Sequence, residues 1–235
     1  MANIGGVLPY QYLGGGRDES RAGYRGNPGL SAKPATARPA QSRRKRALDI
    51  VISLIALFLF LPVFAAAAFM IRATSPGPII FRQHRTGLGG QSFELFKFRT
   101  MRVTEDGERI RHAMKGDSRV TRVGAFLRAT SIDELPQLIN VLRGDMSLVG
   151  PRPHALAHDR HYGALVHGYA KRFMVKPGIT GLAQIRGLRG EIHELYSMER
   201  RVRADREYIA SWSLRCDLRI ILLTLPRMLG DPHAY

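Results

Sequence analysis

The sequence predicts an α+β protein, mainly α-helical, in which one segment of the chain enters a membrane. Three observations support this prediction. A long apolar run is interrupted by Pro62, two short alternating segments flank a glycine-rich turn, and several later stretches repeat apolar residues at helical spacing. We therefore expect a re-entrant membrane helix-break-helix, a small β-hairpin, and short amphipathic interfacial helices around a candidate active site.

The composition points to an anionic partner. The 235 residues include 36 Lys and Arg but only 19 Asp and Glu, which gives a net charge of +17. Nucleic acid, an anionic membrane surface and phosphate-bearing substrates would all suit this balance. The single cysteine, Cys216, excludes an intrachain disulfide and is compatible with a reducing cytoplasm.

Residues 1–42 are rich in Gly, Pro, Ala, Ser and Arg and contain few branched apolar residues. Such a segment cannot bury enough surface to fold, so we expect a disordered basic tail. A re-entrant membrane segment is expected at residues 43–74. Residues 75–235 are then expected to form a cytoplasmic, membrane-associated domain that carries the candidate active site.

The predicted membrane segment begins with a basic cluster, Arg43 to Arg46, and continues into 22 uncharged residues from Ile50 to Ile71. At about 1.5 Å per helical residue, this run is long enough to cross a bilayer. A buried core helix and a cleaved signal peptide are the alternatives. The uniform apolarity of the run argues against a buried core helix. Its distance from the N-terminus and the basic residues that follow it argue against a cleaved signal peptide.

Pro62 lies near the middle of this run, where it removes a backbone hydrogen bond and breaks the helix. Basic residues flank both ends of the run, and basic flanks favour the cytoplasmic side. The segment is therefore expected to dip into the membrane, break at Pro62 and return to the same face. A kinked helix that crosses the membrane stays open as the alternative.

The stretches Ile79–Gln83 and Ser92–Phe98 are predicted to pair as a β-hairpin around the glycine-rich turn at 86–90. The hairpin carries four cations: Arg82, Arg85, Lys97 and Arg99. Charges on a hairpin often form only a solvated face. These cations lie in the sequence between the predicted membrane segment and the adjacent carboxylates Asp133 and Glu134. This place favours contact with phosphates or lipid headgroups.

The rest of the chain is predicted to be mostly helical. Charged or amphipathic helices are expected at 105–115, 117–130 and 194–212, and a short strand at 182–185. Residues 217–229 are apolar but too few to span a membrane, so they either lie at the interface or pack on the core. The histidines between 154 and 167 are interpreted as exposed helix residues rather than as a metal site.

The stretch from Thr130 to Pro153 holds the candidate active site. Ser131 and Glu134 have the spacing of a capping box, and apolar residues then recur at helical spacing. The helix begins either with Ser131 as its cap or with Pro136 as its first residue. In both cases Asp133 and Glu134 lie near the positive end of the helix dipole, which favours their ionised forms.

An ionised aspartate can act as a nucleophile or as a ligand for a hard cation. The simpler alternative is that Asp133 and Glu134 only cap a helix. However, Arg152 follows in a rigid turn between Pro151 and Pro153. Because a carboxylate pair near a stiffly held arginine suits a metal-bound phosphate, we favour a catalytic site.

Several further motifs accompany the run from Ser131 to Pro153. They are Arg46-Ala-Leu-Asp49, Ser75-Pro-Gly-Pro78, Phe81-Arg-Gln83, Lys97-Phe-Arg-Thr-Met101 and Lys176-Pro-Gly-Ile-Thr-Gly-Leu-Ala-Gln184. Together, and in this order, they resemble the bacterial sugar transferases, the monotopic phosphoglycosyl transferases that begin lipid-linked glycan assembly. The resemblance covers roughly residues 43–235, and the chain looks most like members that use UDP-glucose, with UDP-galactose as the alternative.

The resemblance implies an enzyme of exopolysaccharide or capsule synthesis that transfers sugar 1-phosphate from a UDP-sugar to polyprenyl (undecaprenyl) phosphate and releases UMP. Asp133 would attack the sugar-proximal phosphate and form a covalent phosphosugar intermediate. Glu134 would bind Mg²⁺ together with Asp133, or handle protons. The expected substrate-binding residues are Arg152, Pro151, Pro153, Lys97 and Arg99. The enzyme would lie at the bacterial inner membrane, with its catalytic domain facing the cytoplasm.

Two other classes of protein stay open. A non-catalytic membrane scaffold of a polysaccharide complex would need the membrane segment but not Asp133. A nucleic-acid-binding protein would share the basic charge, but the apolar run speaks against it, and no nucleic-acid partner is expected. The expected partners are a UDP-sugar, polyprenyl phosphate and an anionic membrane surface, and a homo-oligomer is left open.

Overall fold

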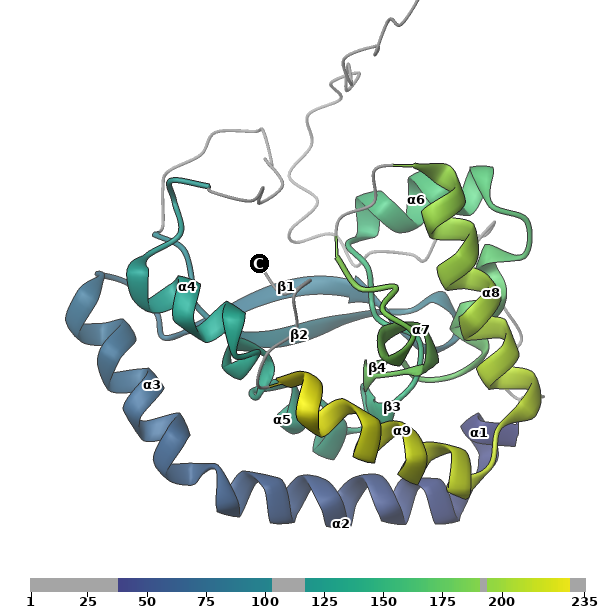
Figure 1. Cartoon of the computed structure of the whole chain (residues 1–235), viewed down its shortest axis with the longest axis horizontal. Helices are drawn as coiled ribbons and strands as arrows, with labels where there is room; N and C mark the ends of the chain where they lie inside the picture. Colours follow the sequence, from purple (N-terminus) through teal and green to yellow (C-terminus); the bar gives the residue numbers. More distant parts are fainter. Residues whose placement is uncertain (1–37, 103–116, 191–193, 229–235) are drawn as a thin grey trace, which may run out of the picture.

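The computed structural model describes residues 38–102, 117–190 and 194–228. Within them the chain is mainly helical with two small sheets, which confirms the predicted α+β character (Figure 1). Residues 1–37 of the expected tail, and the helix expected at 105–115, lie outside the described residues. The expectation of disorder is wrong for the end of the tail, which forms a short helix, α1 (Arg38–Gln41), directly ahead of the basic cluster at Arg43 to Arg46.

The apolar run forms two helices, α2 (Arg43–Leu59) and α3 (Leu61–Thr74), which meet at a bend of 61° (Figure 1). In the described part of the chain, no single helix is long and apolar enough to cross a membrane, whereas this bent pair meets the requirement when taken together. The break falls at Phe60, and Pro62 lies in the first turn of α3, where a missing N–H is tolerated. The expected helix-break-helix is therefore present.

The faces of α2 are reversed relative to a helix on the surface of a soluble protein. Its buried residues are polar: Lys45, Asp49 and Ser53. Ile52 and Leu57 pack against the core, but most of its large apolar residues are exposed, and Phe58 is 78% exposed. Because a surface helix normally turns its apolar stripe toward the core, the exposed apolar face of α2 suits an apolar solvent.

Polar contacts anchor α2 to the rest of the protein. Asp49 accepts hydrogen bonds from Ser147 Oγ at 2.8 Å and from the backbone N–H of Leu148 at 3.0 Å. The Arg46 guanidinium donates to two carbonyls, at 2.5 and 2.7 Å, in the last turn of α5 (Gln137–Arg143). These carbonyls lie at the C-terminal end of the helix, where the positive charge of Arg46 complements the helix dipole. The Gly144 N–H also donates to one of them, that of Val141, at 3.1 Å.

The predicted β-hairpin is confirmed. β1 (Ile80–Thr86) pairs antiparallel with β2 (Ser92–Phe98), with Ile80 opposite Phe98 and Thr86 opposite Ser92. A short 3-10 turn, η3 (Leu88–Gly90), closes the hairpin. β1 extends beyond its predicted end at Gln83, because the pairing with β2 continues up to the turn.

The chain then forms α4 (Arg122–Ala129), a single 3-10 turn named η4 (Ile132–Glu134), and α5. The capping box predicted at Ser131 is wrong, since Ser131 adopts a φ of 55° and its side chain makes no capping hydrogen bond. α5 begins at Gln137 with Pro136 as its N-cap, one residue from the alternative start. Pro136 has no N–H to donate to the preceding turn, so it separates η4 from α5.

A second sheet consists of β3 (Ser147–Val149) and β4 (Gly178–Thr180), which pair in parallel. The strand predicted at 182–185 is wrong, because these residues form the short helix α7 (Leu182–Ile185) and the strand lies just before them. A Cβ on Gly178 would lie 2.1 Å from the backbone N of Gly150. Only glycine at position 178 therefore allows β4 to approach the backbone at the end of β3, and this close approach fixes where the two strands pair.

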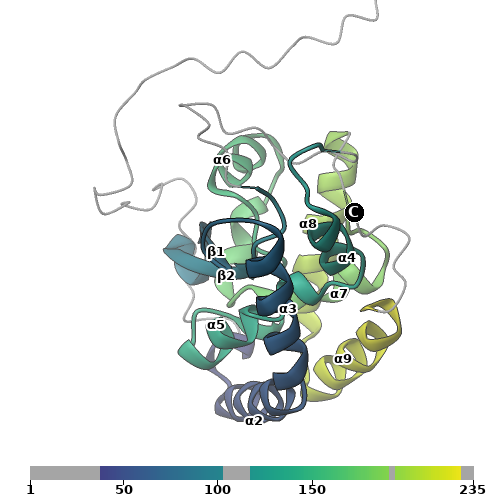
Figure 2. The ribbon, with the colours of Figure 1, turned by 90° about the vertical axis from the view of Figure 1, so that its left-hand side faces the viewer.

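The remaining elements are α6 (Leu156–Leu165), η5 (Tyr169–Met174), α8 (Leu195–Ser211) and α9 (Leu214–Met228). The long charged helix predicted at 194–212 is confirmed as α8. α9 lies at the same end of the molecule as α2 (Figure 1 and Figure 2). It buries Ile220 in the core, which confirms the core-packing alternative for one face. The opposite face exposes Leu218, Leu222 and Leu225, and its place at a membrane interface stays a prediction.

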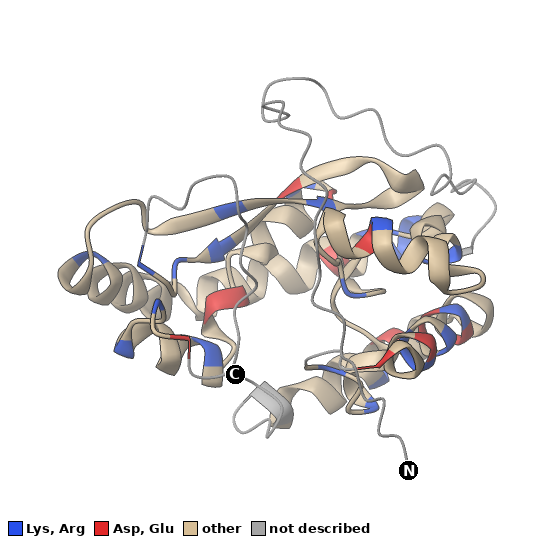
Figure 3. Cartoon of the chain, turned by 90° about the horizontal axis from the view of Figure 1, so that it is seen from above, with Lys and Arg blue, Asp and Glu red and all other residues tan. Residues whose placement is uncertain are grey.

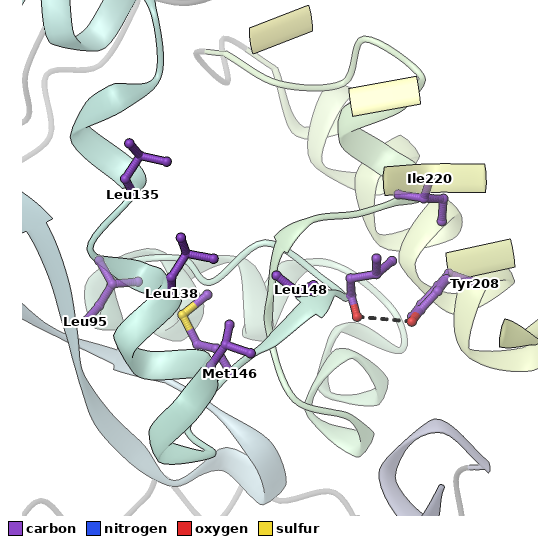
Figure 4. Close-up of a cluster of buried hydrophobic side chains, with 9 residues drawn as sticks. Leu95, Leu135, Leu138, Met146, Leu148, Tyr208 and Ile220 are labelled. Atoms are coloured by element: carbon purple, nitrogen blue, oxygen red, sulfur yellow. Dashed lines mark hydrogen bonds between the residues drawn. The ribbon is translucent and has the colours of Figure 1, made fainter. Parts of the chain in front are cut away.

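The main core joins the hairpin to the C-terminal helices (Figure 4). It brings together Leu95 of β2, Leu138 of α5 and Ile220 of α9. Tyr208 of α8 adds a buried ring whose hydroxyl donates to the carbonyl of Val149 at 3.1 Å. The core thus fixes α5, and with it the short η4 turn that precedes it, against both sheets.

Candidate active site

Asp133 and Glu134 lie on η4, the 3-10 turn between α4 and α5. Two elements hold the η4 turn in place, because it contacts both α4 and β2. Ser131 precedes them in a left-handed conformation, which turns the chain sharply after α4. Both carboxylate residues are only 7% exposed, so they form a buried acidic pair rather than an exposed helix cap.

Glu134 is surrounded by cations from three distant parts of the chain. Lys97 of β2 approaches Oε1 with its Nζ at 2.9 Å. Arg152 donates to both carboxylate oxygens, with Nη1 at 3.1 Å from Oε2. Arg189 adds a third cation, with Nη2 at 3.6 Å from Oε1. The two-pronged contact of Arg152 matches the geometry in which guanidinium binds carboxylate most specifically.

The acidic pair is electrostatically unequal. Burial alone would raise the pKa of the Glu134 carboxyl, but the charges of Arg152 and Lys97 outweigh burial and hold that pKa well below its usual range. Burial also raises the pKa of Asp133. Lys97, whose Nζ lies 3.9 Å from Oδ2, opposes this rise without cancelling it. Glu134 is therefore a firmly ionised anchor, while Asp133 is the more basic carboxylate.

The turn that carries Arg152 is held by its backbone. The carbonyl of Pro151 accepts a hydrogen bond from the N–H of Gly178 at 2.9 Å, and the carbonyl of Arg152 accepts one from Arg172 Nη2 at 2.7 Å. Pro151 and Pro153 themselves restrict the backbone on both sides. The structure thus brings together Asp133, Glu134, Lys97, Arg152 and its flanking prolines, as the sequence predicts.

Arg99 is not brought to this cluster. Its guanidinium donates to the backbone carbonyls of Ser75 and Pro76 at 2.8 and 2.6 Å, and to Ser75 Oγ at 2.9 Å. It therefore ties the exit of α3 to the end of the hairpin. Residues two apart in a strand share one face, but Arg99 lies beyond the last paired residue, Phe98, so strand geometry does not hold it on the face of Lys97.

Sequence reasoning did not assign two cations to the site. Arg189, from the loop after α7, contacts Glu134 and also donates from Nη1 to Ser131 Oγ at 3.2 Å. Arg128, on α4, donates to Thr100 Oγ1 at 2.9 Å and lowers the pKa of Asp133. Arg128 precedes Asp133 by five residues, and the left-handed Ser131 ends the helical path between them, so this spacing gave no usable signal. Arg189 had none either, because its approach depends on tertiary packing.

The expectation of exposed helix histidines holds for His161 on α6 and is wrong for His154, which is buried and precedes the helix. His158 on α6 is half-buried, and His167 is exposed but lies in the turn after α6. His154 is buried beside Tyr169, with Nδ1 at 2.8 Å from the hydroxyl. Over residues 38–102, 117–190 and 194–228, no group of three or more His, Cys, Asp or Glu side chains could hold a metal ion.

The model of the family described as bacterial sugar transferase matches residues 40–231, most of this chain. The chain belongs to that family. Three relatives, each described as a UDP-glucose:undecaprenyl-phosphate glucose-1-phosphate transferase, illustrate the similarity of this bacterial sugar transferase to known proteins. The relative from Caulobacter vibrioides is 54% identical over 208 residues, which cover 88% of this chain and 78% of that protein.

The relatives from Xanthomonas campestris pv. campestris and Escherichia coli are 53% and 51% identical. The matched residues make up 80% and 81% of this chain but only 39% and 41% of those proteins. The bacterial sugar transferase described here thus spans less than half the length of these two relatives. The candidate active site lies inside the family match, since Asp133, Glu134 and Arg152 all fall between residues 40 and 231.

The donor set of this bacterial sugar transferase fits Mg²⁺ rather than a softer metal. Asp133 and Glu134 offer only hard carboxylate oxygens, and Mg²⁺ is commonly held by one or two carboxylates together with substrate phosphates. Both oxygens of Glu134 already accept hydrogen bonds from Arg152. Asp133 is therefore the better placed of the two to share a cation with a bound phosphate.

Proposed function

We propose that this protein transfers glucose 1-phosphate from UDP-glucose to polyprenyl (undecaprenyl) phosphate and releases UMP. The observation that carries the proposal is a buried Asp133–Glu134 pair, ringed by Lys97, Arg152 and Arg189, in a chain of the bacterial sugar transferase family. These cations outnumber the carboxylates, so the site is prepared for a further anion. A diphosphate supplies that charge.

Asp133 is the proposed nucleophile. Its raised pKa marks the more basic carboxylate of the pair, and it forms no two-pronged ion pair like that of Glu134 with Arg152. In the first step a carboxylate oxygen attacks the sugar-proximal phosphorus, the bond from that phosphorus to the bridging oxygen breaks, and UMP leaves. An acyl phosphate joins Asp133 to the sugar phosphate.

In the second step, a phosphate oxygen of the polyprenyl phosphate attacks the same phosphorus. The bond to Asp133 breaks, which restores the carboxylate and yields a polyprenyl diphosphate sugar. Glu134 has a different role in this scheme. With its ionised form fixed by surrounding cations, it holds Lys97, Arg152 and Arg189 in place around the position of the donor phosphates.

Mg²⁺ is the proposed cofactor, and Asp133 would hold it together with phosphate oxygens of the donor, with Glu134 as a second ligand only if it releases a hydrogen bond from Arg152. When bound, it would neutralise phosphate charge that otherwise repels an attacking carboxylate. The residues of the chain contribute in the same direction. Lys97 and Arg152 lie beside the acidic pair and lower the repulsion that a second anion would meet there.

The bent pair of α2 and α3 is proposed to be re-entrant, dipping into the cytoplasmic leaflet of the inner membrane and returning. The exposed apolar residues of α2, α3 and α9 support this placement: Leu54, Phe58, Phe69, Leu222 and Leu225. Many Lys and Arg lie along the ribbon outside these stretches (Figure 3), as expected beside an anionic membrane surface. Such an anchor would hold the site at the depth of a lipid phosphate.

The test measures UMP release by detergent-purified protein with UDP-glucose and Mg²⁺, with and without polyprenyl phosphate. We expect turnover with the lipid and at most one equivalent of UMP per enzyme without it. Asp133→Asn should abolish both signals. Asp145→Asn, in the turn after α5, is the matched control and should change neither.

Release from UDP-galactose but not from UDP-glucose would keep the chemistry and correct the donor. Full turnover by Asp133→Asn would refute the covalent step. If no donor yields UMP from the wild type, and its cellular role also survives Asp133→Asn, the protein is a membrane scaffold rather than an enzyme.

A further inference from the structure

A buried polar cluster lies behind the turn that carries Arg152, and the proposed chemistry leaves it without a role. Its members are His154, Asp159, Tyr169, Arg172 and Asp205. They come from four elements: the turn itself, α6, η5 and α8. Burying this many polar groups costs stability unless each finds partners, so a cluster of this kind needs a physical reason.

Arg172 is the centre of the cluster and is 3% exposed. Its Nε donates to Asp205 Oδ2 at 2.7 Å, and its Nη1 donates to His154 Nδ1 at 2.9 Å and to the Tyr169 hydroxyl at 3.0 Å. Its Nη2 donates to the backbone carbonyl of Arg152 at 2.7 Å. One planar guanidinium therefore links α8 and η5 to the backbone of the site arginine.

The protonation of His154 agrees with this arrangement. Burial, followed by the charge of Arg172, holds the pKa of His154 well below its usual range, so the ring is neutral. A neutral ring can accept a hydrogen bond at Nδ1, as the contact from Arg172 requires. The Tyr169 hydroxyl in turn donates to Asp159 Oδ1 at 2.6 Å, which orients the partners of Arg172 from the far side.

We propose that Arg172 is a positioning residue for the reaction: through the carbonyl of Arg152, it sets the direction in which the Arg152 guanidinium points. Arg172 itself does not touch the acidic pair. Its influence passes through hydrogen bonds to the turn, to His154 and to the backbone carbonyl of Arg152, whose side chain then holds Glu134 with two hydrogen bonds. The proposal rests on the proposed function, in which Arg152 binds the donor phosphates.

Lysine cannot replace Arg172 in this role. An ammonium group is a single point donor, whereas the guanidinium reaches Asp205, His154 and the Arg152 carbonyl from different nitrogens. Arg172→Lys therefore loosens the turn at the Arg152 carbonyl while keeping the charge. Since a displacement of about 1 Å at a reacting group can cost on the order of a hundredfold in rate, we expect kcat/KM to fall by about 10- to 100-fold.

The experiment is a double-mutant cycle between Arg172→Lys and Arg152→Lys, measured as UMP release in detergent with UDP-glucose, Mg²⁺ and polyprenyl phosphate. If Arg172 acts through Arg152, Arg172→Lys should cost less than about twofold in the Arg152→Lys background. Both single variants should also divide their losses between kcat and KM in the same way. Arg186→Lys, an exposed partner of Glu207, is the matched control and should stay within twofold of the wild type.

All assays are run below the unfolding temperature of every variant. Should Arg172→Lys fail to fold, Asp205→Asn provides the second probe, because it loosens Arg172 without removing it. We expect Asp205→Asn to lower kcat/KM by less than Arg172→Lys does, and to have no effect on kcat/KM in the Arg152→Lys background. Equal losses in both backgrounds, or no loss from either probe, would overturn the positioning role while the active wild type leaves the proposed function intact. A wild type without turnover would instead refute the proposed function.

Discussion

Replacing Arg152 by lysine removes the two-pronged contact with Glu134 but keeps a positive charge at the site. Arg152 reaches both oxygens of the carboxylate, whereas an ammonium group can approach only as a point charge. Glu134 would not be left uncompensated, because Lys97 Nζ lies 2.9 Å from Oε1. The variant is therefore expected to fold, and its defect should appear in catalysis.

The size of the defect follows from the hydrogen bond to the donor phosphates that a lysine cannot make in place of the arginine fork. A hydrogen bond to a charged group contributes about 1.5–3 kcal/mol, and lysine retains one of the two that arginine makes. At about 1.4 kcal/mol for each tenfold change in rate, kcat/KM should fall by roughly 10- to 150-fold. Arg152→Gln removes the charge as well and should lose more.

The assay is steady-state UMP release from UDP-glucose with saturating polyprenyl phosphate, alongside thermal unfolding of each variant in detergent. Arg186→Lys again serves as the control, since it alters an exposed arginine–carboxylate pair far from the acidic pair in sequence. An Arg152→Lys enzyme within threefold of the wild type would refute the inference that the fork geometry is used in the reaction.

Three further predictions concern the acidic pair and the membrane helix. Lys97→Met removes a positive charge that lowers the pKa of Asp133, so the pKa of Asp133 should rise further. The acidic limb of the kcat/KM profile should then move to higher pH. An unmoved limb would count against Asp133 as the ionising group. Arg189→Gln should raise the KM for UDP-glucose more than it lowers kcat, and the reverse split would argue against a donor contact. Asp49→Ala leaves buried donors of β3 unsatisfied and should destabilise the protein by about 2–5 kcal/mol in detergent unfolding, while a change near zero would contradict the anchoring of α2.

The unequal acidic pair shows how adjacent carboxylates acquire different roles. Asp133 and Glu134 are neighbours with equal exposure, yet burial raises the pKa of one and surrounding cations lower that of the other. Their chemistry therefore differs through the side chains that reach them, not through their position along the chain. Two of those cations, Lys97 and Arg152, arrive from β2 and from the turn after β3.

Much of the architecture was available from the sequence itself. The apolar run with Pro62 predicted the bent helix pair, and the alternating segments around a glycine-rich turn predicted the β-hairpin. The same is true of the acidic pair and of Arg152 between its prolines, which lie together in the structure as expected. These features depend on local chemistry, on backbone restriction by proline and glycine, and on hydrophobic periodicity. All three are properties of residues close together in the sequence.

Other features were decided only by the tertiary structure. The sequence could not separate Lys97, which reaches the acidic pair, from Arg99, which instead holds the exit of α3. Nor could it bring Arg189 to Glu134 or bury His154 against Arg172. Each of these outcomes depends on contacts between residues far apart in the chain, and burial and Coulomb energy act on distances in space rather than on spacing in sequence.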